Sequence, residues 1–312
     1  MGPISLSKTN NTVSCEDKYC GLVLAAGMSS RMYPTGRVIS KQLMTVYDKP
    51  LVYYPIAVLM EAGIRDIFII VATEALNLFV KLLGDGSQWG VRFNFIVQPE
   101  PQGIAQAFHL CKEKIQGKSV FLILGDNVIF GTNFQWVVKN ALNHNSNATI
   151  FSYPVEDPSR YGVVELGTEG EPISLVEKPQ HTNSHLAVPG LYLYDDQVVD
   201  LASKLTPSHR GEYEITDVNK EYMAKGALSV VQLDKSVSWF DAGTYDSILE
   251  ASLAIRTQQN HKTFVGYPEY IAFINGYINY SQFNTLIRQF PKCFYRSNLE
   301  YLQQKWVKEK MQ

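Results

Sequence analysis

The chain has 312 residues and a mass of 35.2 kDa, with 46% hydrophobic and 19% charged residues. Such a composition excludes a globally disordered chain, because it supplies ample apolar surface for a core. The 28 lysines and arginines nearly balance the 30 aspartates and glutamates, leaving a net charge of −2. This balance gives no electrostatic reason to expect nucleic acid or an anionic membrane as a partner.

The sequence shows no sign of export or membrane anchoring. Its longest apolar runs, such as Asp66–Ala72, have the length of a strand and fall short of the 18 or more residues that a membrane helix needs. The first 18 residues contain neither a basic region nor an apolar one. Four cysteines in a chain of this length favour a reducing compartment over a disulfide scaffold. We therefore expect a soluble, cytoplasmic protein.

Strands and helices are predicted to alternate in the first half of the chain. Residues 1–18 are polar and are expected to form a flexible extension. A buried strand over Gly21–Ala26 follows, and Pro50 is expected to open a helix over Leu51–Ala62. The later strands are predicted at Asp66–Ala72, Val91–Val97 and Ser119–Leu124, with helices to Leu83 and over Ile104–Gln116. This alternation predicts βαβ units around a mainly parallel sheet.

Beyond residue 148 the pattern becomes less regular. Short strands are predicted at Ala148–Tyr153, Gly162–Leu166, Ile173–Glu177, Leu186–Tyr194, Leu228–Leu233 and Val237–Phe240. After Thr244 the chain looks helical, with helices starting near Thr244, Pro268, Ser281 and Ser297. We predict an α/β fold with a doubly wound, mostly parallel sheet, a mixed extension and C-terminal helices. It would form one domain over 19–312, with parts at 19–147, 148–243 and 244–312.

Three loops that follow predicted strands carry groups suited to a nucleotide. They are the small-residue loop Gly27–Ser30, residues 98–103, and residues 125–127, which contain Asp126. Ligands of parallel sheets bind beyond the carboxyl ends of the strands, so the three loops should meet at one rim. Small residues let backbone N–H groups approach phosphate, Arg31 and Lys41 add positive charge, and Asp126 suits Mg²⁺. Each feature alone is more readily explained as a turn or a solvated charge, but the coincidence of three such loops at one rim favours a nucleotide site.

Other nucleotide-binding classes do not fit. Neither the GxGxxG fingerprint of dinucleotide-binding enzymes nor the GxxxxGK[ST] pattern of P-loop kinases occurs in the chain. The six histidines are scattered, and no cysteine and histidine cluster has the spacing of a zinc site.

Ordered motifs over about residues 20 to 300 carry a family resemblance. They include LVLAAGMSSRM, SKQLMTVYDKP, QPEPQGIAQAF, LGDN, RYGVVEL, VEKP, RGEYEITDVN and WFDAGT. With these motifs in this order, the chain resembles the glucose-1-phosphate thymidylyltransferases of the sugar-nucleotide pyrophosphorylase family. The resemblance implies a Rossmann-like nucleotidyltransferase that uses Mg²⁺ to make dTDP-glucose and pyrophosphate from dTTP and glucose 1-phosphate. It also implies a homo-oligomer, commonly a tetramer.

The same resemblance implies roles for individual residues. Catalytic roles fall to Arg31, Lys41, Lys178 and Asp126. The nucleotide would be bound by Ala26, Gly27, Ser29, Ser30, Arg31, Lys41, Gln42, Gln98, Gly103, Asp126 and Asn127. The sugar phosphate would contact Tyr161, Gly162, Glu177, Lys178 and Val188, and Mg²⁺ would be held by Asp126 and Asp241. Residues 19–147 would thus be a nucleotide-binding half and residues 148–243 a sugar-binding half.

The chain departs from the family pattern in two places near the expected site. Only Gly27 remains of the glycines in the first loop, and a left-handed Ser29 would cost about 1–2 kcal/mol, so the loop is expected to follow a different path. Pro189 replaces a usual threonine beside the sugar and removes a backbone donor. Three alternatives therefore stay open: uridylyl transfer, another sugar 1-phosphate, or a regulatory homologue that binds nucleotide sugars without turnover.

Overall fold

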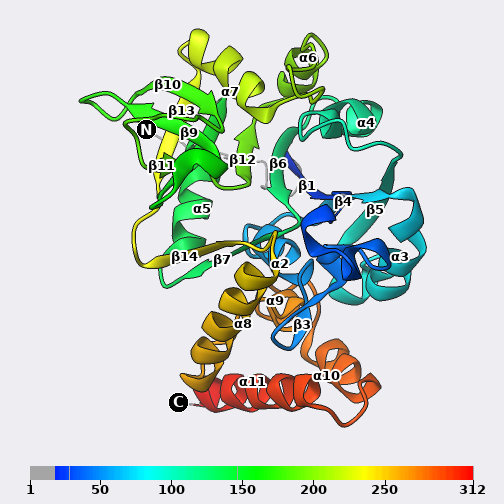
Figure 1. Ribbon diagram of the computed structural model, residues 1–312. Coiled ribbons are helices and arrows are strands. Elements are labelled where there is room, and N and C mark those ends of the chain that lie inside the picture. Colours follow the sequence, from blue (N-terminus) through cyan, green and yellow to red (C-terminus); the bar gives the residue numbers. More distant parts are fainter. Residues whose placement is uncertain (1–17, 28, 146, 312) are drawn as a thin grey trace, which may run out of the picture.

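A mixed sheet of ten strands organises the residues that the computed structural model describes, which are 18–27, 29–145 and 147–311 (Figure 1). Of the predicted N-terminal extension, residues 1–17 lie outside this range. Nine strands form one path in the order β10-β9-β11-β8-β12-β6-β1-β4-β5, and β13 pairs with β8. The sheet thus runs through both the first and the second half of the chain.

The first half of the chain builds the parallel part of the sheet. Its strands are β1 (Tyr19–Ala25), β4 (Asp66–Ala72), β5 (Arg92–Gln98) and β6 (Ser119–Leu124). β1 is central and pairs in parallel with β4 on one side and β6 on the other. The chain moves outward from β1 to β4 and β5 and then returns to the other side of β1, so the order of strands reverses between β1 and β6. A reversal of this kind opens a crevice at the carboxyl ends of the two strands.

The second half of the chain adds antiparallel strands beyond β6. They are β8 (Ala148–Pro154), β9 (Gly162–Leu166), β10 (Pro172–Glu177), β11 (Leu186–Ala187), β12 (Leu191–Tyr194) and β13 (Leu228–Gln232). β12 joins the two halves because it pairs antiparallel with both β6 and β8. The predicted mixed extension is therefore confirmed.

Helices cover both faces of the sheet, because successive side chains of β1 alternate between two hydrophobic clusters. Val23 belongs to the cluster on one face and Leu22 to the cluster on the other, and both are fully buried. The first face is covered by α2 (Tyr53–Glu61), α3 (Leu76–Leu83) and α5 (Phe134–His144), and the second by α4 (Gln106–Ile115), α6 (Val198–Ala202) and α7 (Ile215–Ala224). The doubly wound α/β fold is thus confirmed.

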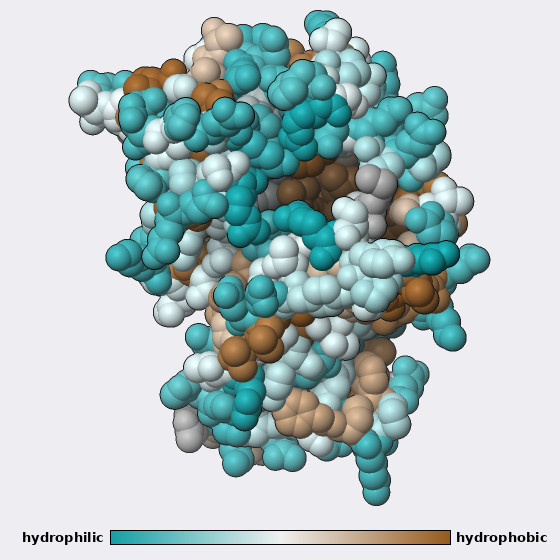
Figure 2. All heavy atoms as spheres, viewed as in Figure 1, coloured by the Kyte–Doolittle hydropathy of each residue, from teal (hydrophilic) through white to brown (hydrophobic). Residues whose placement is uncertain are grey.

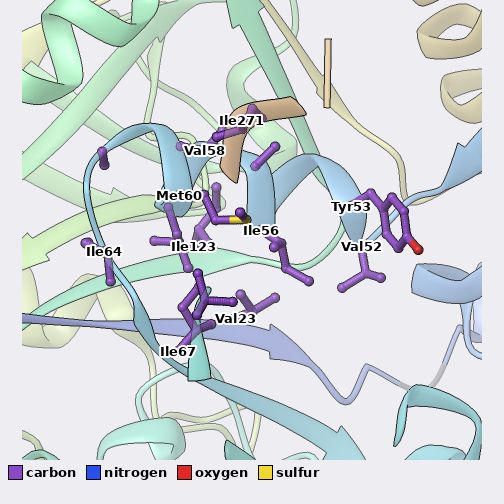
Figure 3. Packing of buried hydrophobic residues seen from close by; sticks show 14 of the residues in the cluster. Val23, Val52, Tyr53, Ile56, Val58, Met60, Ile64, Ile67, Ile123 and Ile271 are labelled. Atoms are coloured by element: carbon purple, nitrogen blue, oxygen red, sulfur yellow. The ribbon is translucent and has the colours of Figure 1, made fainter. Parts of the chain in front are cut away.

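Helix α2 packs between the sheet and the C-terminal helices. Close packing is visible in Figure 3, where strand residues lie beneath the helix and a residue of α9 (Pro268–Ile274) lies on its other side. The residues involved are Val23, Ile67 and Ile123 of the strands, Ile56 and Met60 of the helix, and Ile271 of α9. The other C-terminal helices are α8 (Tyr245–Asn260), α10 (Tyr280–Gln289) and α11 (Phe294–Met311), which lie at one end of the molecule (Figure 1).

Two small ribbons lie outside the main sheet. β2 (Thr45–Val46) pairs with β3 (Lys49–Pro50), and β7 (Asn127–Gly131) pairs antiparallel with β14 (Val237–Asp241). Three 3₁₀ turns, η1 (Ser30–Met32), η2 (Thr35–Arg37) and η3 (Lys41–Leu43), connect β1 to β2. The second ribbon brings segments more than 100 residues apart together beside the sheet rim.

Several predicted elements differ from the observed ones. The helix expected at Leu51–Ala62 begins at Tyr53, because Pro50 belongs to β3 and pairs with Thr45. The strand expected at Leu186–Tyr194 is two strands, because Val188, Pro189 and Gly190 interrupt it, and Pro189 cannot donate a hydrogen bond to a ladder. β2, β3, β7, α5, α6 and α7 were not predicted, and the other predicted strands shift by at most two residues.

Candidate active site

A cleft lies where the sheet order reverses between β1 and β6. It consists of two adjoining hollows of about 550 Å³ and 260 Å³, whose walls share Gly27, Ser30, Arg31 and Lys41. Beside these residues, a hydrogen bond from the Gly125 N–H to the Leu24 carbonyl, at 2.8 Å, links the end of β6 to β1. In Figure 2 the molecular surface is hollowed over β12, β6 and β1, with an apolar floor and hydrophilic residues around it. The cleft thus lies at the position expected for the ligand of an open α/β sheet.

The segment between β1 and β2 supplies two cations of the cleft, Arg31 and Lys41. Ser29 has φ 53° and ψ 26°, so it adopts the left-handed conformation that is expected to cost about 1–2 kcal/mol for a residue other than glycine. Its main-chain carbonyl accepts from Met32 N at 2.9 Å, and its hydroxyl accepts from Lys41 N at 3.0 Å. Gly36 packs against it so closely that an added Cβ would lie 2.3 Å from the Ser29 oxygen. These contacts stabilise the left-handed residue and place Arg31 and Lys41 on one wall.

The β7–β14 ribbon brings the two predicted metal ligands to the same wall. Asp126 immediately precedes β7, and Asp241 ends β14 opposite Asn127. A hydrogen bond from Ala242 N to the Asp126 carbonyl, at 2.9 Å, fastens the two chain segments. Their side chains are 16% and 18% exposed, and both line the larger hollow. Two partly buried carboxylates on one wall therefore face the cleft.

The charges around this pair act on the two carboxyl groups in opposite directions. Burial alone would raise the pKa of Asp126, but the ion pair with the Lys41 ammonium and a hydrogen bond from Asn127 Nδ2 lower it below its ordinary value. Burial and the neighbouring charge of Asp126 raise the pKa of Asp241, which Lys41, Arg31 and Arg160 offset only in part. A site in which two carboxylates resist being ionised together is suited to a divalent cation, and Mg²⁺ commonly takes one or two carboxylates plus substrate phosphates.

The predicted base-reading residues line the smaller hollow. Gln98 is buried at the end of β5, and its Nε2 donates to Gln106 Oε1 at 2.5 Å. The same oxygen of Gln106 accepts from Gln102 N at 3.0 Å. Gly103 has φ 103°, and an added Cβ would lie 2.5 Å from the Tyr213 carbonyl oxygen. A glycine is therefore required at the point where this loop touches Tyr213.

The predicted sugar-side residues line the larger hollow and do not reach the smaller one. Glu177 Oε2 accepts from Thr216 Oγ1 at 2.6 Å, and Lys178 Nζ lies 3.7 Å from Glu177 Oε1. Val188, which follows β11, is fixed to β9 by a hydrogen bond from its N–H to the Gly162 carbonyl at 2.8 Å. Tyr161 stacks at a tilt on Trp239, with ring centroids 5.0 Å apart. All five predicted residues therefore contribute to one wall.

Three predicted nucleotide-binding residues, Ala26, Asn127 and Gln42, differ in how their side chains relate to the cleft. Ala26 is buried and lines neither hollow. The side chain of Asn127 is occupied within the protein: its Oδ1 accepts from Trp239 Nε1 at 2.6 Å and from Gly190 N at 3.1 Å, while its Nδ2 faces Asp126. Gln42 lines the larger hollow, and its Oε1 accepts from Ser40 Oγ at 2.5 Å.

Several polar residues of the cleft were not assigned from the sequence, among them Arg160, Arg210, Glu212, Thr216 and Asn219. Arg210 lies between Glu177 and Glu214, at 3.6 and 3.3 Å, and lines the larger hollow with Thr216, Arg160 and Trp239. Arg210 and Thr216 belong to the RGEYEITDVN motif, which was recognised as a whole without assigning its members. Arg160 stands beside Tyr161 and approaches Asp241 to 3.8 Å. Their positions depend on β9, β10 and α7 being packed together, which no local pattern reveals.

Comparison with known proteins identifies the class that this fold and cleft define. Residues 20–258 match the nucleotidyl transferase family. Similar proteins include the glucose-1-phosphate thymidylyltransferases of Neisseria gonorrhoeae, 44% identical over 90% of this chain and 98% of that protein, and of Mycolicibacterium smegmatis, 45% identical over 88% and 96%.

Two crystal structures support the same relationship. A Bacillus anthracis protein provisionally named a glucose-1-phosphate thymidylyltransferase, determined with a sucrose, has a TM-score of 0.71 at 36% identity and covers 76% of this chain and 95% of its own. A UDP-glucose pyrophosphorylase in complex with UDP-glucose has a TM-score of 0.68 at 25% identity over 77% and 99%.

The chain belongs to the nucleotidyl transferase family. Within that family it belongs with the glucose-1-phosphate thymidylyltransferases, which its 44% identity over nine-tenths of the chain establishes. The predicted family, fold class and enzyme class are thereby confirmed. No helix among the described residues has both the length and the apolar character needed to cross a membrane.

Proposed function

We propose that this protein transfers a deoxythymidylyl group from dTTP to α-D-glucose 1-phosphate, forming dTDP-glucose and pyrophosphate. The observation that carries the proposal is the single cleft in which Arg31 and Lys41, the Asp126 and Asp241 pair, and the wall around Lys178 meet. A cleft that brings several cations and a pair of carboxylates together suits two phosphorylated substrates that must react with each other.

The reaction needs no covalent nucleophile from the protein. A phosphate oxygen of the sugar 1-phosphate forms a bond to the α-phosphorus of dTTP, and the bond from that phosphorus to the oxygen of the β-phosphate breaks. Pyrophosphate leaves with the electron pair. The protein contributes by holding the two phosphates in line and by neutralising charge as it moves to the leaving group.

Individual residues take roles that match their positions. Arg31 and Lys41 hold the triphosphate above the small-residue loop 27–30, while Gln98 and Gly103 contact the base. Lys178, with Arg210 near it in the same hollow, holds the sugar phosphate, and Glu177 accepts a sugar hydroxyl. A planar guanidinium and a compact ammonium both suit phosphate recognition.

Asp126 and Asp241 are the residues that would hold Mg²⁺, and they fit it because both carboxylates face the cleft and repel each other without a cation. Bound there, Mg²⁺ would neutralise charge on the phosphate oxygens. The Lys41 ammonium pairs with Asp126 and keeps that carboxylate ionised, so the aspartate is ready to accept a cation.

The experiment is pyrophosphate release measured with dTTP, dUTP, UTP and ATP, each with glucose 1-phosphate and with other sugar 1-phosphates. Gln98 can pair with thymine or uracil, and the extra methyl group is worth roughly 0.8 kcal/mol, so we expect dTTP to exceed dUTP by less than tenfold. Efficient use of ATP would contradict the role of Gln98, because a purine leaves buried polar groups unpaired.

Two variants separate the phosphate sites. Arg31→Ala should weaken dTTP binding, whereas Lys178→Ala should lower kcat/KM for glucose 1-phosphate and leave dTTP affinity unchanged. Arg37→Ala is the control for the first, because Arg37 lies on the same loop outside both hollows, and the exposed Lys235 serves for the second. Equal losses of dTTP affinity in both variants would overturn the assignment of Lys178.

The remaining family expectations belong to the same proposal. A cytoplasmic location agrees with the free thiols of Cys20, Cys111 and Cys293, the cysteines that the described residues contain. A homo-oligomer, a tetramer by family resemblance, agrees with the exposed apolar row of Tyr245, Leu249 and Leu253 on α8. Light scattering on the purified protein tests the oligomeric state.

A further inference from the structure

The hydroxyl of Tyr245 joins the first turn of α8 to the loop that carries Arg31. It donates to the Met32 carbonyl oxygen at 2.8 Å and lies 3.3 Å from Thr35 Oγ1. We propose that Tyr245 is a positioning residue that holds the Arg31 loop in place for the nucleotide triphosphate. The inference rests on the proposed function, because it takes the role of Arg31 from there.

Arg31 depends on its backbone for its direction. Its side chain is exposed, and it forms no ion pair with any residue in the described part of the chain. The closest packing is with Gly243, where an added Cβ would lie 2.9 Å from Arg31 Nη2. A long, exposed side chain loses conformational entropy when it binds a phosphate, and a mobile backbone would lose entropy as well. A fixed loop therefore improves the affinity that Arg31 provides.

Three kinds of contact support the loop: short-range hydrogen bonds in its turns, the packing of Gly36 against Ser29, and the buried side chain of Met32. Residues 30–37 form two successive 3₁₀ turns, η1 and η2, which are held by short-range bonds such as Tyr33 N to the Ser30 carbonyl at 3.3 Å. Turns of this kind have poor hydrogen-bond geometry and rarely extend. The start of the loop is fixed through the hydroxyl of Ser29, which accepts from Lys41 N. Tyr245 contacts the middle of the loop, between the two turns.

Tyr245 is itself held in a fixed relation to the carboxylates. Thr244 caps α8 in a reciprocal capping box with Ser247, which fixes the first turn of the helix. Three residues before Thr244, Asp241 ends β14, and the intervening Ala242 donates to the Asp126 carbonyl. The short segment from Asp241 to Tyr245 therefore fixes the position of the Arg31 loop relative to both carboxylates.

The test removes the hydroxyl and keeps the ring. Tyr245→Phe should raise the dissociation constant of dTTP about fivefold, which is the change expected for the loss of one net hydrogen bond. The KM of glucose 1-phosphate should stay unchanged. Tyr280→Phe is the matched control, because Tyr280 is similarly exposed on the surface of α10 and stacks on Trp306 without a hydroxyl contact to the described residues. An unchanged dTTP affinity in Tyr245→Phe, or equal losses for both substrates, would overturn the inference.

Two further measurements distinguish a positioning role from a structural one. In an Arg31→Ala background, Tyr245→Phe should cause no further loss of dTTP affinity, since the hydroxyl acts through Arg31; full additivity would overturn the inference. In the nucleotide-free protein, hydrogen exchange of a peptide covering residues 29–38 should accelerate in Tyr245→Phe and not in Tyr280→Phe. Unchanged exchange overturns the inference. If instead Arg31→Ala itself leaves dTTP affinity intact, the proposed role of Arg31 fails rather than that of Tyr245.

Discussion

The side chain of Asn127 holds three parts of the cleft together, so its truncation should destabilise the protein and disturb the sugar end of the site. Its Oδ1 accepts from the indole N–H of Trp239 in β14 and from the backbone N–H of Gly190, which precedes β12. Asn127 is 3% exposed. In Asn127→Ala both donors lose their acceptor at a place that water reaches poorly.

The expected magnitude follows from those two donors. Each unsatisfied buried donor costs about 1–3 kcal/mol, and the lower part of that range applies to Trp239, which is only partly buried. We expect Asn127→Ala to lower the free energy of unfolding by about 2–4 kcal/mol, which for a chain of this size is a fall in Tm of roughly 4–8 °C. The KM of glucose 1-phosphate should also rise, because Gly190 and Trp239 line the sugar side of the larger hollow.

Thermal unfolding followed by circular dichroism measures this change. Asn133→Ala is the control, since Asn133 is exposed near the other end of the same strand and its side chain does not cap α5. In a Trp239→Phe background one of the two donors is absent, so Asn127→Ala should cost about 1–2 kcal/mol less than in the wild type. A wild-type Tm in Asn127→Ala, or strict additivity with Trp239→Phe, would refute the reasoning.

Three other predictions concern charge and backbone geometry. Asp241→Asn should lower turnover at least about 100-fold in the pyrophosphate assay yet leave the Tm at neutral pH without divalent cations equal or higher, because it removes a like charge beside Asp126; a lower Tm would contradict this. Gly103→Ala should weaken dTTP binding more than tenfold by calorimetry, since the positive φ and the Tyr213 carbonyl exclude a Cβ, and an unchanged affinity would be the opposing result. Burial raises the pKa of Glu61 to about 7, so the folded protein binds this proton more tightly than the unfolded chain does and loses stability as the pH rises from about 4.5 to 7. The Tm of Glu61→Gln should therefore increase relative to that of the wild type over this pH interval. A Tm difference that does not change with pH would contradict this prediction.

The parallel half of the fold was predictable from the sequence because its signals are local. β4 and β6 were predicted residue for residue, since continuous apolar runs of strand length stand between helical segments of clear periodicity. The loops after β1, β5 and β6 could be assigned to one rim for the same reason: parallel strands present all their carboxyl ends on one edge. The family motifs then assigned chemistry to Arg31, Lys41 and Asp126 by resemblance.

What the sequence did not reveal depends on contacts between distant segments. The pairing of β7 with β14 brings Asp241 opposite Asn127, although 114 positions separate them in the sequence, and the short apolar run 128–130 does not reveal which strand it pairs with. Tyr245 looked like an ordinary residue of a helix start, and its role follows only from the packing of α8 against the Arg31 loop. The left-handed Ser29 is likewise sustained by Lys41 and Gly36 rather than by its own preference. Local propensity and motif therefore predicted many of the residues that line the cleft, whereas tertiary packing added others, such as Arg160 and Arg210, and decided how all of them are held there.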